Sequence, residues 1–498
     1  MHVSSLCFAL THIFTMETTT SNKHKPHIAI FPSPGMGHLI PLAEFAKQLV
    51  FSHHFSVSFI VPNFGFPIKS QKSFLDSLPE PITAVYLPPP VISNDLSGSL
   101  NPATLVTTGM TRCVQGLRDS LKTLTESTRL VALVVDAVGT DAFDLTEELD
   151  ILRYVFAPFC AMSLSLFFHL SKLDETGIKD YKDLPDPIEI PGCIPIRPTA
   201  LPGVIQDSNS EFYKLFLYHA KRYYLADGII VNSFIDLEPG AFKVLMEDGS
   251  GKPPFYPIGP LLQTGPTIDD GTLCLTWLDK QPRGSVLFVS FGSSGTISQE
   301  QLTELALGLE MSEQKFIWVV RIPAKNAANG VYYNAQSNKE EDPFDFLPNG
   351  FMERTITRGL GLLVKSWAPQ VQILSHGSTG GFISHCGWNS TIESLTHGVP
   401  LIAWPLYAEQ EMIKLMLTQD LKVALTPKKN ENGMVGREEI AKCVRDLIVG
   451  EEGKLLRKKT TELKDAAAMA TSEHGSSTKS LAQLIQIFEN HNVLPLKK

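Results

Sequence analysis

The chain has 498 residues, 43% of them hydrophobic, so it is long enough for two or three domains with large cores. Its formal net charge of −9 argues against nucleic acid as the main partner, because surfaces that bind nucleic acid are normally basic. The seven cysteines form no C-x-x-C pair and no zinc-ligand spacing, which favours a reducing compartment. No apolar run has the length of a membrane-spanning helix, so we expect no stable membrane insertion.

Residues 1–25 are predicted to form a disordered extension. The stretch 4–14 is mildly apolar, but it has no basic beginning and is interrupted by Thr11 and His12. It is therefore a poor match to a secretory signal peptide.

The first elements predict a doubly wound α/β sheet. Residues 27–31 and 57–61 have the composition of buried strands, and apolar spacing between them predicts a helix over 39–49. This βαβ order is typical of a doubly wound fold. The dinucleotide fingerprint is absent, because Ile40 stands where its third glycine is needed, and no Walker-type loop occurs.

His38 and Asp136 are candidates for an acid–base pair. His38 ends the turn after the first strand, where an imidazole with a pKa near neutrality could act as a general base. Asp136 ends the apolar strand 131–135, and its carboxylate could accept the second ring N–H of His38. Asp141 and Asp144 compete for this role, although Asp141 fits better in the first turn of the next helix. A solvated or capping histidine and a capping aspartate are the alternatives.

The middle of the chain is less regular. Residues 64–105 are rich in Pro, Ser and Gly and are predicted to be loops and short pieces. Residues 156–170 are aromatic and apolar, which predicts a core segment. Residues 228–232 predict the last strand of the first half, and the Gly- and Pro-rich segment 249–272 predicts an interdomain linker.

The strand pattern restarts in the second half. Residues 285–291 and 316–320 predict strands, and the turn 292–295 follows the first of them. Residues 324–345 predict a mobile surface loop. Near the end of the chain, the apolar spacing predicts four helices, over residues 412–425, 437–449, 455–470 and 478–490.

A polar cluster lies between two apolar runs of the second half. Residues 380–384 predict a strand that ends at His385, and a helix follows that is stopped by Gly398 and Pro400. Backbone N–H groups and the helix dipole at such a turn favour an anion, typically phosphate, to which Asn389 and Ser390 can add side-chain donors. An ordinary buried βαβ unit is the alternative.

Residues 367–410, with WAPQ at the start, HCGWNS in the middle and EQ at the end, resemble the signature box of plant secondary-product glycosyltransferases, which use UDP-sugars. The turn PSPGMGH resembles the catalytic-histidine motif of that family, and VVDAVGTDAFD resembles its catalytic-aspartate stretch at Asp136. The resemblance extends over nearly the whole chain from His27. PSPGMGHLIPL, FFHLSKLDET and PLYAEQ are similar to plant hydroquinone (arbutin-type) and monolignol glucosyltransferases.

The resemblance implies two Rossmann-like doubly wound domains that face a cleft, the GT-B arrangement. The acceptor domain would span residues 26–248 and the UDP-sugar domain residues 273–475, joined by the linker 249–272. A C-terminal helix within 476–498 would cross back to the first domain.

The resemblance also implies the roles of site residues. Trp367 would stack on uracil, Gln370 would lie near the ribose or base, and Glu393 would accept the ribose hydroxyls. The closing Gln410 is associated with glucose as the donor sugar. The other implied donor-site residues are Ser293, Ala368, His385, Gly387, Trp388, Asn389, Ser390 and Glu409. Gly37, Phe159 and Met162 are expected in the acceptor pocket.

Two positions depart from the family pattern. Relatives often carry Thr or Ser near Phe159 and Cys160, where a hydroxyl can reach the sugar, and this chain has neither at that pair. Ile413 stands just after the box, where relatives usually place Asn. These departures put one sugar contact and the packing beside the sugar in doubt.

The expected function is inverting transfer of glucose from UDP-glucose to a small phenol such as hydroquinone or a hydroxycinnamyl alcohol, giving an O-β-glucoside without a metal. Flavonoids, coumarins or carboxylate acceptors are the alternative substrates. A nucleotide-dependent oxidoreductase and a non-catalytic UDP-sugar-binding protein are the rival classes. The sequon at residues 389–391 lies in the proposed phosphate site, where a glycan would block it, so we expect a cytoplasmic protein. We expect a monomer.

Overall fold

The computed structural model describes residues 25–63, 69–89, 102–264, 271–324 and 341–492. The predicted N-terminal extension lies outside these ranges except for Lys25. Parts of the predicted loops 64–105 and 324–345, and of the linker 249–272, also lie outside them.

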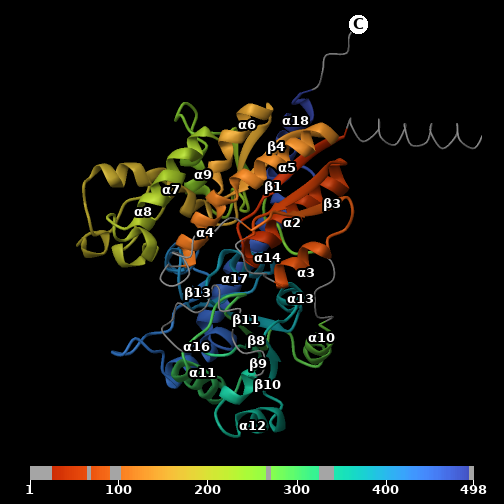
Figure 1. The fold of residues 1–498 in the computed structure, drawn as a ribbon. Helices are drawn as coiled ribbons and strands as arrows, with labels where there is room; N and C mark the ends of the chain where they lie inside the picture. Colours follow the sequence, from red (N-terminus) through yellow and green to blue (C-terminus); the bar gives the residue numbers. More distant parts are fainter. Residues whose placement is uncertain (1–24, 64–68, 90–101, 265–270, 325–340, 493–498) are drawn as a thin grey trace, which may run out of the picture.

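Two parallel sheets, one in each lobe of Figure 1, organise the described residues. The strands of the first sheet, in spatial order, are β3 (Ile82–Tyr86), β2 (Ser56–Val61), β1 (Pro26–Phe31), β4 (Arg129–Asp136), β5 (Leu152–Ala157), β6 (Gly228–Val231) and β7 (Phe255–Pro257). Those of the second sheet are β10 (Gly361–Lys365), β9 (Lys315–Val320), β8 (Val286–Ser290), β11 (Thr379–Ser384), β12 (Leu401–Ala403) and β13 (Ala424–Leu425).

The two sheets share one strand order. In each, the first six strands along the chain lie in the order third, second, first, fourth, fifth, sixth. Successive strands are therefore added first on one side of β1 and then, from β4 onward, on its other side. The same change of side occurs between β8 and β11 in the second sheet. Ligands of open α/β sheets bind at such switch points, beyond the carboxyl ends of the strands. The predicted fold class, two Rossmann-like domains, is confirmed.

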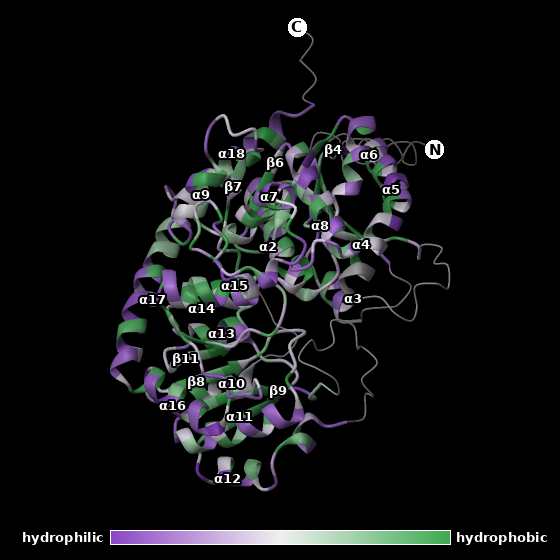
Figure 2. Ribbon diagram, turned by 90° about the vertical axis from the view of Figure 1, so that its left-hand side faces the viewer, coloured by the Kyte–Doolittle hydropathy of each residue, from purple (hydrophilic) through white to green (hydrophobic). Residues whose placement is uncertain are grey.

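Helices cover both faces of each sheet, which explains why the central strands are apolar throughout. Side chains of a strand alternate between its faces. Ile28 and Ile30 accordingly pack in a core with α2 (Met36–His53) and α18 (Ser476–Asn490). Ala29 and Phe31 pack in a second core with α5 (Val114–Ser127) and α7 (Ala161–Glu175). Figure 2 shows hydrophobic residues on the central strands and hydrophilic residues along α17 (Glu451–Ala470) at the periphery.

The helices of the first lobe are α2 (Met36–His53), α3 (Lys69–Asp76), α4 (Pro102–Arg112), α5 (Val114–Ser127), α6 (Phe143–Leu149), α7 (Ala161–Glu175), α8 (Glu211–Arg222) and α9 (Pro239–Leu245). Those that follow in the chain are α10 (Thr272–Leu278), α11 (Gln299–Ser312), α12 (Phe351–Thr357), α13 (Gln370–Ser375), α14 (Trp388–His397), α15 (Gln410–Leu415), α16 (Arg437–Ile448), α17 (Glu451–Ala470) and α18 (Ser476–Asn490).

The last helix, α18, lies with the first lobe (Figure 1), although it ends the chain. Phe488 packs edge-on against Tyr154 of β5, with ring centroids 5.0 Å apart. Arg129, at the start of β4, donates to the backbone carbonyls of Phe488, Glu489 and His491 at 3.5, 2.5 and 3.0 Å. A cation at the carboxyl end of a helix is favourable because unpaired carbonyls gather there.

Three segments differ from the sequence-based expectation. The segment 64–105 contains α3 and β3, and β3 lacks an apolar signal because it lies at the sheet edge with only Ile82 buried. The segment 249–272 contains β7, a three-residue strand paired with β6. The helix predicted over 412–425 was wrong beyond residue 420. The helix α15 passes into a π-helix (Met416–Asp420), which ends at Asp420. The strand β13 follows and pairs with β12.

Candidate active site

The switch point of the first sheet brings His38 and Asp136 together. His38 lies in the first turn of α2, just after β1, and Asp136 is the last residue of β4. Their side chains are 98 residues apart in sequence, yet His38 Nδ1 lies 2.8 Å from Asp136 Oδ2. The carboxylate is fully buried and also accepts the backbone N–H groups of Ser33 and Ala137. With Nδ1 bound to Asp136, the ring has Nε2 to take a proton.

The electrostatics of this pair suit a base. Burial lowers the pKa of His38, but the charge and hydrogen bond of Asp136, together with the charge of Glu409, outweigh it, so the pKa lies above its ordinary value. Glu409 belongs to the second half of the chain. The pKa of Glu409 is in turn raised, chiefly by burial, although the His38 charge lowers it.

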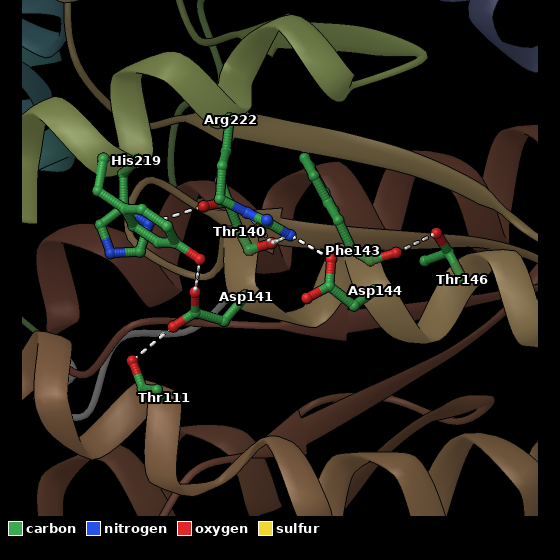
Figure 3. A network of polar contacts seen from close by, with 9 residues as sticks. Thr111, Thr140, Asp141, Phe143, Asp144, Thr146, His219 and Arg222 are labelled. Carbon is green, nitrogen blue, oxygen red and sulfur yellow. Dashed lines mark hydrogen bonds and ion pairs between the residues drawn. The ribbon is translucent and has the colours of Figure 1, made fainter.

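The two competing aspartates are engaged elsewhere, as Figure 3 shows. Asp141 accepts hydrogen bonds from Thr111 and Tyr218 at 2.5 and 2.8 Å. Asp144, in the first turn of α6, pairs with Arg222 at 2.6 Å. Of the three candidates, Asp136 is therefore the carboxylate that contacts His38.

The switch point of the second sheet holds His385 between two glycines. Gly292 follows β8 with φ +76°, and a Cβ there would lie 2.5 Å from the His385 ring. A Cβ on Gly387 would lie 2.3 Å from His385 Nε2. Burial, with the charge of Arg321, lowers the pKa of His385 to about 4, so its ring is neutral. Ser293, predicted to contact a diphosphate, is the residue after Gly292 in the turn that follows β8.

Arg321 was missed by the sequence analysis. It directly follows β9 and donates to the Gly292 carbonyl at 2.8 Å, next to His385. A basic residue immediately after a buried strand was the signal that could have found it. Burial lowers the pKa of its guanidinium.

The first turn of α14 connects the two domains. Asn389 Nδ2 donates to the Gly37 carbonyl at 2.7 Å, next to His38. That carbonyl lacks its usual helical donor, because the residue four positions on is Pro41, which has no N–H. The indole of Trp388 donates to the carbonyl of Asn232 at 2.7 Å, so its side chain also binds the first domain. The predicted phosphate site thus adjoins the predicted base.

The residues expected around the nucleoside lie together. Gln370, which begins α13, donates from Nε2 to Glu393 Oε2 at 2.6 Å and to Ser390 Oγ at 2.9 Å. Burial raises the pKa of Glu393 to about 7, although the hydrogen bond from Gln370 acts in the opposite direction. Trp367 is half-buried just after β10, and Ala368 beside it is buried.

Gln410 organises the loop at the end of the box. Its Oε1 accepts the N–H groups of Leu406 and Tyr407 at 2.8 and 2.9 Å, which leaves its amide nitrogen as the donor end of the side chain. Ile413, one turn further along α15, is fully buried in the hydrophobic core that also contains Trp388. At this position, where relatives usually carry Asn, the Ile413 side chain therefore packs into the hydrophobic core.

The residues expected around the acceptor lie at the start of α7. The ring of Phe159 stacks on Phe167, with centroids 5.8 Å apart. Met162 is buried, and the sulfur of Cys160 lies 3.1 Å from Ser163 Oγ. Gly37, on the His38 turn, is exposed.

A carboxylate that the sequence analysis missed, Glu238, holds the amino end of α7. It accepts the N–H groups of Ala161 and Met162 at 2.9 and 2.8 Å and the hydroxyl of Ser233 at 2.6 Å. Burial raises the pKa of Glu238 despite these three bonds. No local pattern marked this residue, because the two α7 N–H groups that it accepts lie more than 70 positions away.

In the part of the chain that the structure describes, no group of three or more His, Cys, Asp or Glu side chains could hold a metal ion. The helices of this same part include none that is long and apolar enough to cross a membrane.

Comparison with known proteins gives a consistent result. The family described as “UDP-glucoronosyl and UDP-glucosyl transferase” matches residues 274–452. Hydroquinone glucosyltransferase from Rauvolfia serpentina is 56% identical over 94% of this chain and 99% of its own length. UDP-glycosyltransferase 72B1 from Arabidopsis thaliana is 49% identical over 94% of this chain and 97% of its own length.

A solved structure extends this likeness to three dimensions. UGT2 from Phytolacca americana, in complex with UDP-2fluoro-glucose and pterostilbene, is 46% identical to this chain, with a TM-score of 0.84. The likeness covers 93% of this chain and 99% of that one.

Proposed function

The chain belongs to the family of UDP-glucosyl and UDP-glucuronosyl transferases, and we propose that it transfers glucose from UDP-glucose to the hydroxyl of a small phenol. It is a UDP-glucose-dependent glycosyltransferase, and the UDP-sugar is a co-substrate. One observation carries the proposal. The His38–Asp136 pair at the first switch point lies next to the α14 turn of the second, through the hydrogen bond from Asn389 to Gly37.

The acceptor class rests on two supports. The relative that is 56% identical is named for hydroquinone, and a solved relative binds pterostilbene. The stacked rings of Phe159 and Phe167 at the expected acceptor site suit a flat aromatic molecule.

The proposed reaction begins with proton transfer from the phenol to His38 Nε2. The Asp136 carboxylate stabilises the imidazolium that forms and holds the ring in the correct tautomer. The phenolic oxygen then forms a bond to the anomeric carbon while the bond from that carbon to the UDP oxygen breaks. A single displacement inverts the configuration, so α-linked UDP-glucose gives a β-glucoside.

The leaving diphosphate gains charge as the bond breaks. The N–H groups at the start of α14, with the Ser293 and Ser390 hydroxyls, are the donors that we expect to stabilise it. We therefore propose a reaction that needs no metal, which activity in excess EDTA would test. We also propose a cytoplasmic protein, because the sequon at residues 389–391 falls in this turn, where a glycan would block it.

Product analysis by mass spectrometry tests the proposal. Purified protein is incubated with UDP-glucose and, in parallel, hydroquinone, coniferyl alcohol, a coumarin and a flavonol. We expect a mass gain of one hexose on hydroquinone and coniferyl alcohol, absent in a His38→Ala control that still binds UDP. Transfer to the flavonol or coumarin alone would overturn the acceptor class, and no transfer with UDP-glucose bound would overturn the proposed reaction.

A further inference from the structure

The turn that follows Asp136 is fixed by a tyrosine from a distant segment. Tyr223 directly follows α8 and is fully buried, and its hydroxyl donates to the Ala137 carbonyl at 2.9 Å. Ala137 is also the residue whose N–H donates to Asp136 Oδ1, at 2.5 Å. Tyr223 thus anchors one side of a residue whose other side orients the carboxylate that holds His38.

Side chains of α8 fix the same turn, as Figure 3 shows. His219 Nδ1 lies 2.7 Å from the Thr140 hydroxyl, and Arg222 donates twice to the Thr140 carbonyl, at 3.2 and 3.1 Å. Tyr218 donates to Asp141. Three residues of α8 and Tyr223 directly after it therefore contact residues 137–141, and the contact from Tyr223 is the nearest to Asp136.

The ring of Tyr223 is itself held by a column of aromatic rings. Tyr223 stacks on Phe167 with centroids 5.3 Å apart and an interplanar angle of 17°. Phe167 stacks in the same way on Phe159, at 5.8 Å and 17°. Such offset stacks restrict the ring plane, so the direction in which the hydroxyl points is fixed. Burial, with the charge of Asp136, raises the pKa of Tyr223 well above its ordinary value, so the hydroxyl keeps its proton.

From this geometry we infer that Tyr223 is a positioning residue, whose hydroxyl holds the Ala137 turn so that Asp136 stays aligned with His38. That this alignment affects catalysis rests on the proposed function. Loss of the hydroxyl leaves a buried carbonyl unpaired and lets the turn relax. Asp136 would then contact His38 less closely, and misalignment of a base by a fraction of an ångström lowers the rate of proton transfer.

The test is Tyr223→Phe, which keeps the stacked ring and removes the hydroxyl alone. We expect kcat to fall roughly tenfold, with the KM values for UDP-glucose and phenol unchanged within about twofold. The matched control is Tyr224→Phe at the next position, which is 44% exposed, and we expect it to keep the wild-type kcat. A merely structural role would lower the melting temperature without this division between kcat and KM.

A second readout is the pKa of His38, followed by NMR titration of its ring protons and assigned with His38→Gln. The charges that face His38 are those of Asp136 and Glu409, and Tyr223→Phe changes neither. A looser contact with Asp136 should lower the pKa of His38 in Tyr223→Phe and not in Tyr224→Phe.

Equal pKa values for His38 in wild type and Tyr223→Phe would overturn the inference. This measurement stands on its own even if the wild-type protein transfers no sugar, which would overturn only the proposed function. A fall in kcat without a change in pKa would also count against positioning through Asp136.

Discussion

The two sheets share a strand order, and each places a histidine at its switch point, yet the two histidines differ in protonation. His38 contacts the buried Asp136 at 2.8 Å, and its pKa is raised. His385 lies near Arg321 and between two glycines, and its pKa is lowered to about 4. Both rings are partly or wholly buried, so burial alone does not explain the difference.

The partner decides the role of each ring. A carboxylate stabilises an imidazolium, so His38 can hold a proton taken from an acceptor. Burial and the nearby guanidinium of Arg321 keep His385 neutral, so it can donate one hydrogen bond without competing for that proton. We therefore propose that His38, after the first strand of its sheet, is a base and that His385, after the fourth strand of the other sheet, is a neutral donor. Three experiments bear on this contrast, and a fourth tests the donor site.

The largest effect is expected from His38→Ala. Loss of a general base costs about 10²- to 10⁴-fold in rate, so kcat should fall into that range while the Kd for UDP, measured by calorimetry, stays within about twofold. His54→Asn, at the opposite end of α2, is the control. Loss of UDP binding in His38→Ala would mean that the ring is structural.

Asp136→Asn should reduce kcat by about 10²-fold or more, since the wrong tautomer of His38 is then favoured. The acidic side of the pH–rate profile is the sharper readout. The base must be neutral, so activity rises with pH through the pKa of His38. Without the carboxylate, burial lowers that pKa, and the rising limb should move to lower pH. A limb that stays in place would show that Asp136 does not set the protonation of His38.

Gly292→Ala tests the close approach of Gly292 to the His385 ring. A Cβ would meet the ring at 2.5 Å, and overpacking of this kind costs about 1–3 kcal/mol. The KM for UDP-glucose should therefore rise roughly tenfold, with the pH–rate profile unchanged. Gly284→Ala is the matched control, because Gly284 also has positive φ but nothing lies within 4 Å of its Cβ position. An equal rise in both variants would trace the effect to backbone strain.

The smallest effect concerns Glu393, with a pKa raised to about 7. Its ionised form accepts ribose hydroxyls better than its protonated form does. UDP-glucose binding, measured by calorimetry between pH 6 and pH 8, should therefore tighten by roughly severalfold as pH rises. Glu393→Gln should bind more weakly and show no such trend. A pH-independent Kd in the wild type would argue against a ribose contact at this carboxylate.

Much of the fold could be predicted because parallel strands buried on both faces leave continuous apolar runs. β1, β4, β8 and β11 all show this signal, and they are the strands that carry the site. β3 and β7 could not be predicted, since a mostly exposed edge strand and a three-residue strand leave no run to recognise. β13 was hidden for a similar reason, as it has two residues and follows a helix.

The supporting residues of the site could not be predicted either. Arg321, Glu238 and Tyr223 act on groups that lie 29, 76 and 86 positions away in sequence. Their neighbours along the chain give no sign of these partners, because only the order of the strands brings them together.

The sequence by itself determined that polar side chains end the central strands, that a helix begins at each of these turns, and which family the turns resemble. Those features are local, so spacing and residue type reveal them. Only the tertiary structure decided that Asp136, and not Asp141 or Asp144, contacts His38, and that Asn389 reaches across to Gly37. These contacts join segments far apart in the chain. Strand order and domain packing set them, and no local pattern encodes either.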